Sequence, residues 1–140
     1  TETVQDCIKS VENIHLYDSF VLITIETPFK RCELIDSAIN IKKIFDVDTV
    51  VGLRPNDQIL YNHNGKGMVC VNNPESKLKL ERKQNYAKVS GILLRDLNDF
   101  QKNNNLSGTK IGHVIFDQEA ALFIQSKLDL LFAEAILKNK

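Results

Sequence analysis

The chain has 140 residues, and its 18 basic and 18 acidic side chains give a formal net charge of zero. This length is typical of one domain, and an apolar share of 43% is that of a folded protein rather than a disordered one. A net charge of zero argues against a uniformly basic surface, which a dedicated nucleic-acid-binding protein would show. We therefore predict a single α+β domain over residues 1–140.

The cysteines and the lengths of the apolar runs bear on the compartment. Cys7, Cys32 and Cys70 are an odd, widely spaced set without a Cys-x-x-Cys motif, which is typical of reduced thiols in an intracellular protein. No unbroken apolar run approaches the ~20 residues of a membrane-spanning helix. We expect a cytoplasmic or nuclear protein without a transmembrane segment. Because residue 1 is Thr1 rather than Met, we also expect a fragment or a processed product.

The first part of the chain predicts a helix, a strand, a second helix and a second strand. Apolar residues three or four apart within residues 4–14 indicate an amphipathic helix. The β-branched, nearly continuous apolar run in 17–26 indicates a strand that is buried on both faces. Thr27-Pro28 is typical of a helix start, and the helical spacing continues over 30–45. Residues 47–53 predict the second strand.

The middle of the chain predicts short strands joined by tight turns. Residues 59–63 and 68–71 flank Asn64-Gly65, and this dipeptide between two strands is typical of a β-hairpin because both residues accept positive φ. Short turns of this kind favour antiparallel pairing. The other predicted elements are strands at 78–82, 87–94 (with a bulge at Gly91) and 109–116, and an exposed loop at 99–108.

The C-terminal residues predict a long amphipathic helix with apolar residues on two sides. Asp117 is the expected N-cap, and the lysines near the end favour the helix dipole. A helix that lies on a sheet needs one apolar stripe, so a second stripe requires another cover. That cover is either the N-terminal helix or a protein partner, which includes a second copy of the chain. The predicted partner-binding residues are Phe123, Ser126, Leu130, Ala133 and Leu137.

The element order supports two folds. About seven strands precede the last helix, and Phe116-Asp117 with Ala120, Phe123 and Leu130 near its start resembles the pleckstrin-homology-like superfold over residues 17–138. The resemblance implies a small bent barrel closed by the helix, although the chain lacks tryptophan and adds a helix at 30–45. We predict an α+β fold of about 6–7 mostly antiparallel strands packed by a long C-terminal helix. The alternative is a ferredoxin-like β-α-β start that leads into an open antiparallel sheet.

Motifs for catalysis and metal binding are weak. His63 lies near Cys70 across the predicted hairpin and His113 lies on the last strand, and a Cys–His pair can generate a thiolate nucleophile. The apolar neighbours of Cys70 favour a core position instead. Asp46-Val47-Asp48 lacks the glycine and the glutamate of a calcium loop, and the histidines lack the spacing of metal ligands. We predict no catalytic residue, no metal and no cofactor.

The zero net charge conceals an uneven distribution. Residues 1–27 hold five acids and one lysine, whereas 54–110 hold ten bases and five acids. The basic 54–95 region predicts a surface for anions such as phosphoinositides or nucleic acid, and alternating charges on solvated strands explain it equally well. The candidates for this anionic patch are Lys66, Lys77, Lys79, Arg82, Lys83 and Lys88.

These observations favour one function and leave two alternatives. The favoured function is a non-catalytic protein–protein interaction module, acting as a subunit or domain of a larger intracellular assembly. One alternative is a small-ligand-binding or enzymatic domain that uses Cys70, His63 and His113. The other is binding of an anionic surface through residues 54–95, with nucleic acid or a membrane surface as the less favoured partners.

Overall fold

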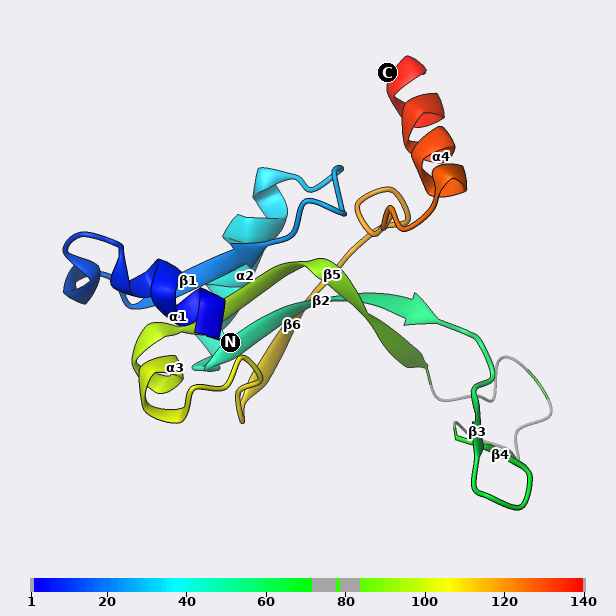
Figure 1. Cartoon of the computed structure of the whole chain (residues 1–140), viewed down its shortest axis with the longest axis horizontal. Coiled ribbons are helices and arrows are strands. Elements are labelled where there is room, and N and C mark those ends of the chain that lie inside the picture. The colour runs from blue at the N-terminus through cyan, green and yellow to red at the C-terminus, as the bar shows by residue number, and fades with distance from the viewer. Residues whose placement is uncertain (1, 72–77, 79–83, 140) are drawn as a thin grey trace.

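The structure, a computed structural model, describes residues 2–71, 78 and 84–139 (Figure 1). These residues form four α-helices, a short 3-10 helix and six strands. In chain order they are α1 (Glu2–Lys9), η1 (Ile14–Leu16), β1 (Ser19–Ile23), α2 (Cys32–Phe45), β2 (Thr49–Asn56), β3 (Tyr61–His63), β4 (Met68–Cys70), β5 (Asn85–Asp96), α3 (Leu97–Asn103), β6 (Ile111–Ile115) and α4 (Lys127–Lys138).

Four strands form an open mixed sheet in the order β1-β5-β2-β6. Strand β5 is antiparallel to both β1 and β2, and β2 is parallel to β6. The predicted α+β class with mostly antiparallel pairing is therefore confirmed. The predicted barrel is wrong for the part of the chain that the structure describes, because β1 and β6 are the two open edges of the sheet.

The order of the strands has a consequence for the position of a site. Strands β1, β2 and β6 all run in the same direction, so their carboxyl ends lie together. We call this end of the sheet its carboxyl edge and the opposite end its amino edge. The β-α-β start and the open sheet of the second predicted fold are present as β1, α2 and β2, with β5 inserted between the two strands. The parallel β6 departs from the fully antiparallel sheet of that prediction.

Each face of the sheet has its own apolar cluster. On one face, Leu34 and Ala38 of α2 pack against Val50, Leu94 and Phe116. On the other face, α1 and α3 form a smaller cluster of Ile8, Leu97 and Phe100, in which the rings of Phe20 and Phe100 meet edge to face at 5.2 Å. The N-terminal helix thus packs near α3. The prediction that it covers the C-terminal helix is wrong.

Two predicted boundaries change because polar side chains take other partners. Thr27 does not cap α2: it is fully buried, and its hydroxyl accepts a hydrogen bond from Lys30 Nζ at 2.7 Å. The helix begins only at Cys32. The loop predicted at 99–108 begins with a helical turn, α3, because the carboxylate of Asp96 accepts a hydrogen bond from Asp99 N and caps it.

The C-terminal helix is shorter than predicted. Asp117 caps a separate turn by accepting a hydrogen bond from Ala120 N at 2.8 Å. Helix α4 begins at Lys127, where Ser126 and Asp129 form a capping box. The predicted partner-binding residues therefore do not lie on one helix, since Phe123 and Ser126 precede α4.

The β3–β4 hairpin is present as predicted, with Gly65 at φ 90° in its turn. It and α4 extend away from the main sheet in different directions (Figure 1). The strand predicted at 78–82 lies outside the described residues, apart from Leu78. No helix in the described ranges has the length and hydropathy needed to cross a membrane.

Gly52 provides a test of the packing between β2 and the chain after β6. A Cβ atom at this position would lie 2.8 Å from Cε1 of Phe116, a residue that is only 1% exposed. We expect Gly52→Ala to lower the free energy of unfolding by about 1–3 kcal/mol through overpacking. Chemical denaturation measures the change.

Gly67→Ala is the matched control for this substitution. A Cβ at Gly67 would have no atom within 4 Å, so the unfolding free energy should stay within about 0.5 kcal/mol of the wild-type value. Equal losses in the two variants would contradict the packing that we describe.

Candidate functional site

The structure does not bring Cys70, His63 and His113 together. In the β3–β4 hairpin Cys70 lies opposite Tyr61, and His63 lies opposite Met68. The Nδ1 atom of His63 accepts a hydrogen bond from Gly65 N within the turn. His113 belongs to the main sheet, where its ring lies 6.2 Å from that of Tyr86. These three side chains therefore do not form one catalytic group.

The predicted anionic patch is only partly visible. Lys66 lies in the hairpin turn and Lys88 on β5, and both are exposed. The other four candidates, Lys77, Lys79, Arg82 and Lys83, lie outside the described residues. The binding of an anionic surface by the 54–95 region thus stays a prediction.

The predicted partner-binding residues fall into different environments. Leu130 and Leu137 of α4 are 48% and 62% exposed, whereas Ala133 is buried. Ser126 is the N-cap of α4, and Phe123 is half-buried in the preceding segment. The exposed part of the stripe remains a candidate interaction surface.

The structure also places the possible metal ligands and the cysteines. No group of three or more His, Cys, Asp or Glu side chains among these residues is arranged to hold a metal ion. Within the described part of the chain, Cys7, Cys32 and Cys70 form no disulfide, and Cys7 and Cys32 are exposed.

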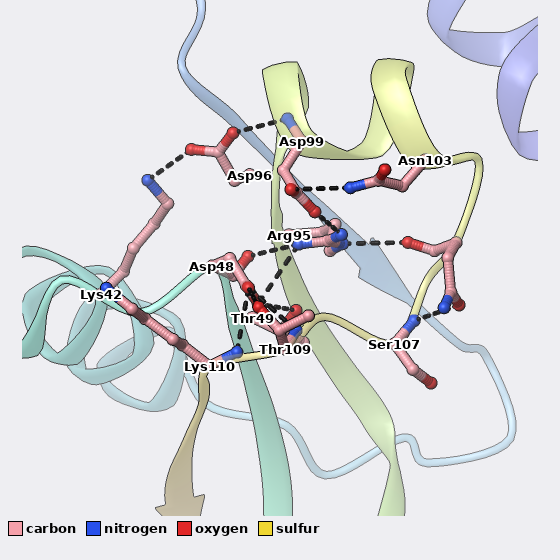
Figure 2. A network of polar contacts seen from close by, with 11 residues as sticks. Lys42, Asp48, Thr49, Arg95, Asp96, Asp99, Asn103, Ser107, Thr109 and Lys110 are labelled. Carbon is pink, nitrogen blue, oxygen red and sulfur yellow. Dashed lines mark hydrogen bonds and ion pairs between the residues drawn. The ribbon is translucent and has the colours of Figure 1, made fainter.

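The most buried polar cluster surrounds Arg95, at the end of β5 (Figure 2). Its side chain is 1% exposed, and it donates hydrogen bonds to the carbonyl oxygens of Asn105 (3.0 Å) and Asp48 (3.1 Å). It also forms ion pairs with the carboxylates of Asp99 and Asp48. A buried guanidinium is stable only when its donors are paired in this way.

Asp48 connects this cluster to the start of β6. One carboxylate oxygen accepts hydrogen bonds from Thr109 N, Thr109 Oγ1 and Lys110 N, each at 2.9 Å, and the other accepts from Thr49 Oγ1 at 2.8 Å. A Cβ at Gly108 would lie 1.6 Å from Asp48 Oδ1, so this approach requires glycine. Partial burial raises the pKa of Asp48, but the hydrogen bonds outweigh it and lower the pKa to about 2.

The Arg95 cluster is structural rather than a binding site. Its donors and acceptors are occupied by groups of the chain itself, and it joins the amino ends of β2 and β6 to the carboxyl end of β5. In open sheets, ligands bind at the opposite edge, outside the carboxyl ends of parallel strands.

A cavity of about 430 Å³ lies at that opposite edge. Arg54 comes from the end of β2, and Lys88 and Ser90 come from the first half of β5, which runs the other way. The rest of the lining comes mainly from the segment between β6 and α4, including Gln118, Ala121, Leu122, Phe123 and Gln125, and from Asp129. The size is that of a small-molecule pocket.

Polar contacts fix the segments beside this cavity. The segment between β6 and α4 is joined to the turn after β1, because Ile124 N donates to Glu26 O at 2.8 Å and Arg31 pairs with Asp117. The hydrogen bond from Ala120 N and the pairing with Arg31 lower the pKa of Asp117. The hydrogen bonds from Ser126 and Gln125 likewise lower the pKa of Asp129, so both carboxylates are occupied by the chain.

The sequence pointed to Lys88 but missed the cavity as a whole. Arg54 lies 34 positions before Lys88 in the sequence. The sequence also predicts that Phe123 lies on the face of a helix, rather than in a loop that lines a cavity. No motif joins these segments. The parallel direction of β2 and β6, which places their ends together, is the feature that defines the site.

Comparison with known proteins bears on the fold. No protein-family model and no curated protein sequence matches the chain. Among solved structures, the crystal structure of 4-diphosphocytidyl-2C-methyl-D-erythritol synthase from Anaerococcus prevotii DSM 20548 is similar, with a TM-score of 0.65 and 14% sequence identity. The match covers 96% of this chain and 64% of that one, so the chain spans less than two thirds of its neighbour's length. At this identity the similarity shows a shared fold.

The lowered pKa of Asp48 predicts a loss of stability in acid. A carboxylate with a folded pKa of about 2 and an ordinary pKa of 3.8 stabilises the fold in full above pH 3.8, and this contribution is lost as the pH falls toward 2. The loss amounts to about 2 kcal/mol. Urea unfolding from about pH 5 to about pH 2 measures it, and Asp48→Asn should flatten that part of the profile.

Asp36→Asn is the control for this experiment, because Asp36 is exposed on α2, away from the cluster. It should keep the wild-type dependence on pH. An Asp48→Asn profile as steep as the wild-type one would refute the role given to the Asp48 carboxylate.

Proposed function

We propose that this chain binds a small phosphate-bearing molecule in the cavity at the carboxyl edge of the sheet. The observation that carries the proposal is Arg54, a cation in the lining of a cavity of about 430 Å³ at this edge. Lys88 also contributes to the lining, but it lies opposite Leu53 rather than Arg54, so its side chain leaves the sheet on the other face. Ligands of open α/β sheets bind at this position in general. The proposal keeps the small-ligand alternative of the sequence analysis and assigns it to different residues.

The lining offers a group for each part of a nucleotide. Arg54 suits phosphate oxygens, since a guanidinium group forms charge-assisted hydrogen bonds with them. The half-buried ring of Phe123 offers a face on which a base can stack, and the amides of Gln118 and Gln125 offer both donors and acceptors. Asp129 stays negatively charged, because its capping-box hydrogen bonds stabilise the ionised carboxylate, so we place the phosphate beside Arg54 and away from Asp129.

The similar solved structure supports a cytidine nucleotide as the first ligand to test. That protein's name describes the synthesis of a diphosphocytidyl compound. This chain spans 64% of it, so the proposal concerns binding of a nucleotide and leaves the neighbour's reaction aside. Shared folds host many functions, and Arg54 in the cavity lining therefore carries the argument.

Calorimetric titration with cytidine triphosphate tests the proposal. We expect Arg54→Ala to weaken binding by about tenfold or more, because it removes a charged hydrogen bond to phosphate, and Lys88→Ala to weaken it less, because the Lys88 side chain leaves the sheet on the other face. Cytidine without phosphate should bind more weakly than the triphosphate.

Lys66→Ala is the matched control, since it removes an equal charge from the hairpin turn, outside the cavity lining. It should leave the affinity unchanged. No binding of the triphosphate by the wild-type chain, or equal losses in all three variants, would exclude the proposed site.

A second candidate function is the interaction module favoured by the sequence. Its support is the surface of α4, where Leu128, Leu131 and Phe132 are 61%, 60% and 56% exposed. The helix extends away from the main sheet (Figure 1). Exposed apolar clusters of this kind are typical of protein–protein contacts. A protein partner or a second copy of the chain is the expected occupant.

Sedimentation velocity over a range of concentrations tests the second copy. We expect the chain to associate, and the double substitution Leu128→Gln with Leu131→Gln to leave it monomeric, because it removes apolar surface from the contact. The thermal midpoint should change little, since both side chains are exposed. Glu134→Gln, on the same helix, is the control and should associate as the wild type does. A wild-type chain that is monomeric throughout would exclude self-association through α4.

A further inference from the structure

Strand β1 has an open backbone edge. Thr24 N donates to Gly91 O, so these two residues form a hydrogen-bonded pair, and the alternation of antiparallel pairing makes Leu22 and Phe20 the next such residues. The N–H and C=O groups of Ser19, Val21 and Ile23 then point away from β5. Within the described ranges no strand pairs with that side of β1.

The side chains of β1 do not suit an exposed edge. The sequence Ser19–Ile23 has no charge and no proline, and it predicts a strand covered on both faces. In the structure Ile23 is 53% exposed and Ile25, just beyond the strand, is 90% exposed. Natural edge strands carry lysine, proline or a bulge that prevents pairing with another chain. Strand β1 has none of these, so its edge is suited to accept a further strand.

The charges at the two ends indicate what kind of strand fits. Asp18 and Glu26 are exposed immediately before and shortly after the apolar run. An antiparallel second copy would bring Asp18 near Glu26 of the other chain, and a parallel copy would bring like carboxylates together. Both arrangements are repulsive. A strand with basic residues at both ends would instead be attracted at both.

We propose that the β1 edge binds an extended apolar segment of a protein partner that is flanked on both sides by Lys or Arg. The segment adds a fifth strand to the main sheet. The outward groups of Val21 and Ile23 supply the hydrogen bonds, and Asp18 and Glu26 select the basic flanks. This is strand addition, in which the backbone gives affinity and the side chains give specificity. The inference is independent of the nucleotide cavity.

Two labelled peptides test the proposal by fluorescence anisotropy. One is Lys-Val-Thr-Val-Ile-Val-Thr-Val-Lys, whose lysines are eight positions apart as Asp18 and Glu26 are, and the other replaces both lysines with glutamate. We expect the lysine peptide to bind at least about tenfold more tightly, with an affinity that falls as salt is added. A lysine peptide with proline in its centre should not bind, because proline prevents strand pairing. Hydrogen exchange should show new protection of the Val21 and Ile23 amides.

Charge reversal supplies the matched variants. Asp18→Lys with Glu26→Lys should invert the preference, so that the glutamate peptide binds more tightly. Asp36→Lys with Glu134→Lys changes the net charge equally at exposed positions on α2 and α4, and it should keep the wild-type preference.

Three results would overturn the proposal. The first is no binding of the lysine peptide, and the second is equal binding of the two charged peptides. The third is self-association of the chain that Ile23→Lys abolishes and the α4 substitutions do not, because the occupant would then be a second copy.

Discussion

The guanidinium of Arg95 is the group around which the main sheet is arranged. It is almost fully buried, and its partners come from the start of β2, from α3 and from the loop that leads to β6. An unpaired charge in such a place would cost several kcal/mol, so the chain segments that carry these partners must all be in position for the charge to be tolerated. The cluster therefore couples the open sheet to the connections at its amino edge.

This constraint separates structure from function within the fold. Polar groups at the amino edge are occupied by one another, and Asp48 is held by Thr109 and Lys110 as well as by Arg95. At the carboxyl edge, Arg54 and Lys88 are exposed and contribute to the lining of a cavity. A sheet whose strands are fixed at one end can carry variable loops at the other, and those loops supply the groups that contact a ligand.

Local patterns in the sequence predict several of the elements but not how these elements assemble. The Asn64-Gly65 hairpin and the periodic spacing of α2 follow from short-range geometry, and both are present. The predicted bent barrel is absent from the described residues. The sheet instead contains the parallel pairing of β2 with β6, which joins residues about 60 positions apart in the chain, and local sequence patterns do not predict such a pairing. The cap of α3 at Asp96 was missed because the asparagines that follow it favour loops. The cavity was missed because its lining is assembled by that same pairing.

The apolar run of β1 shows how a mismatch between sequence and structure becomes informative. Its composition is that of a strand buried on both faces, and among the described strands only β5 pairs with it. The mismatch is not a failure of the pattern, since the faces of the strand are partly covered by the clusters around α2 and α3. Among the described residues, no strand pairs with the outer backbone edge of β1. The side chains of Ile23, at the end of the strand, and Ile25, just after it, are exposed. A strand with basic ends would pair that edge, cover those side chains and neutralise Asp18 and Glu26 in one step, which no solvent-exposed arrangement of β1 achieves.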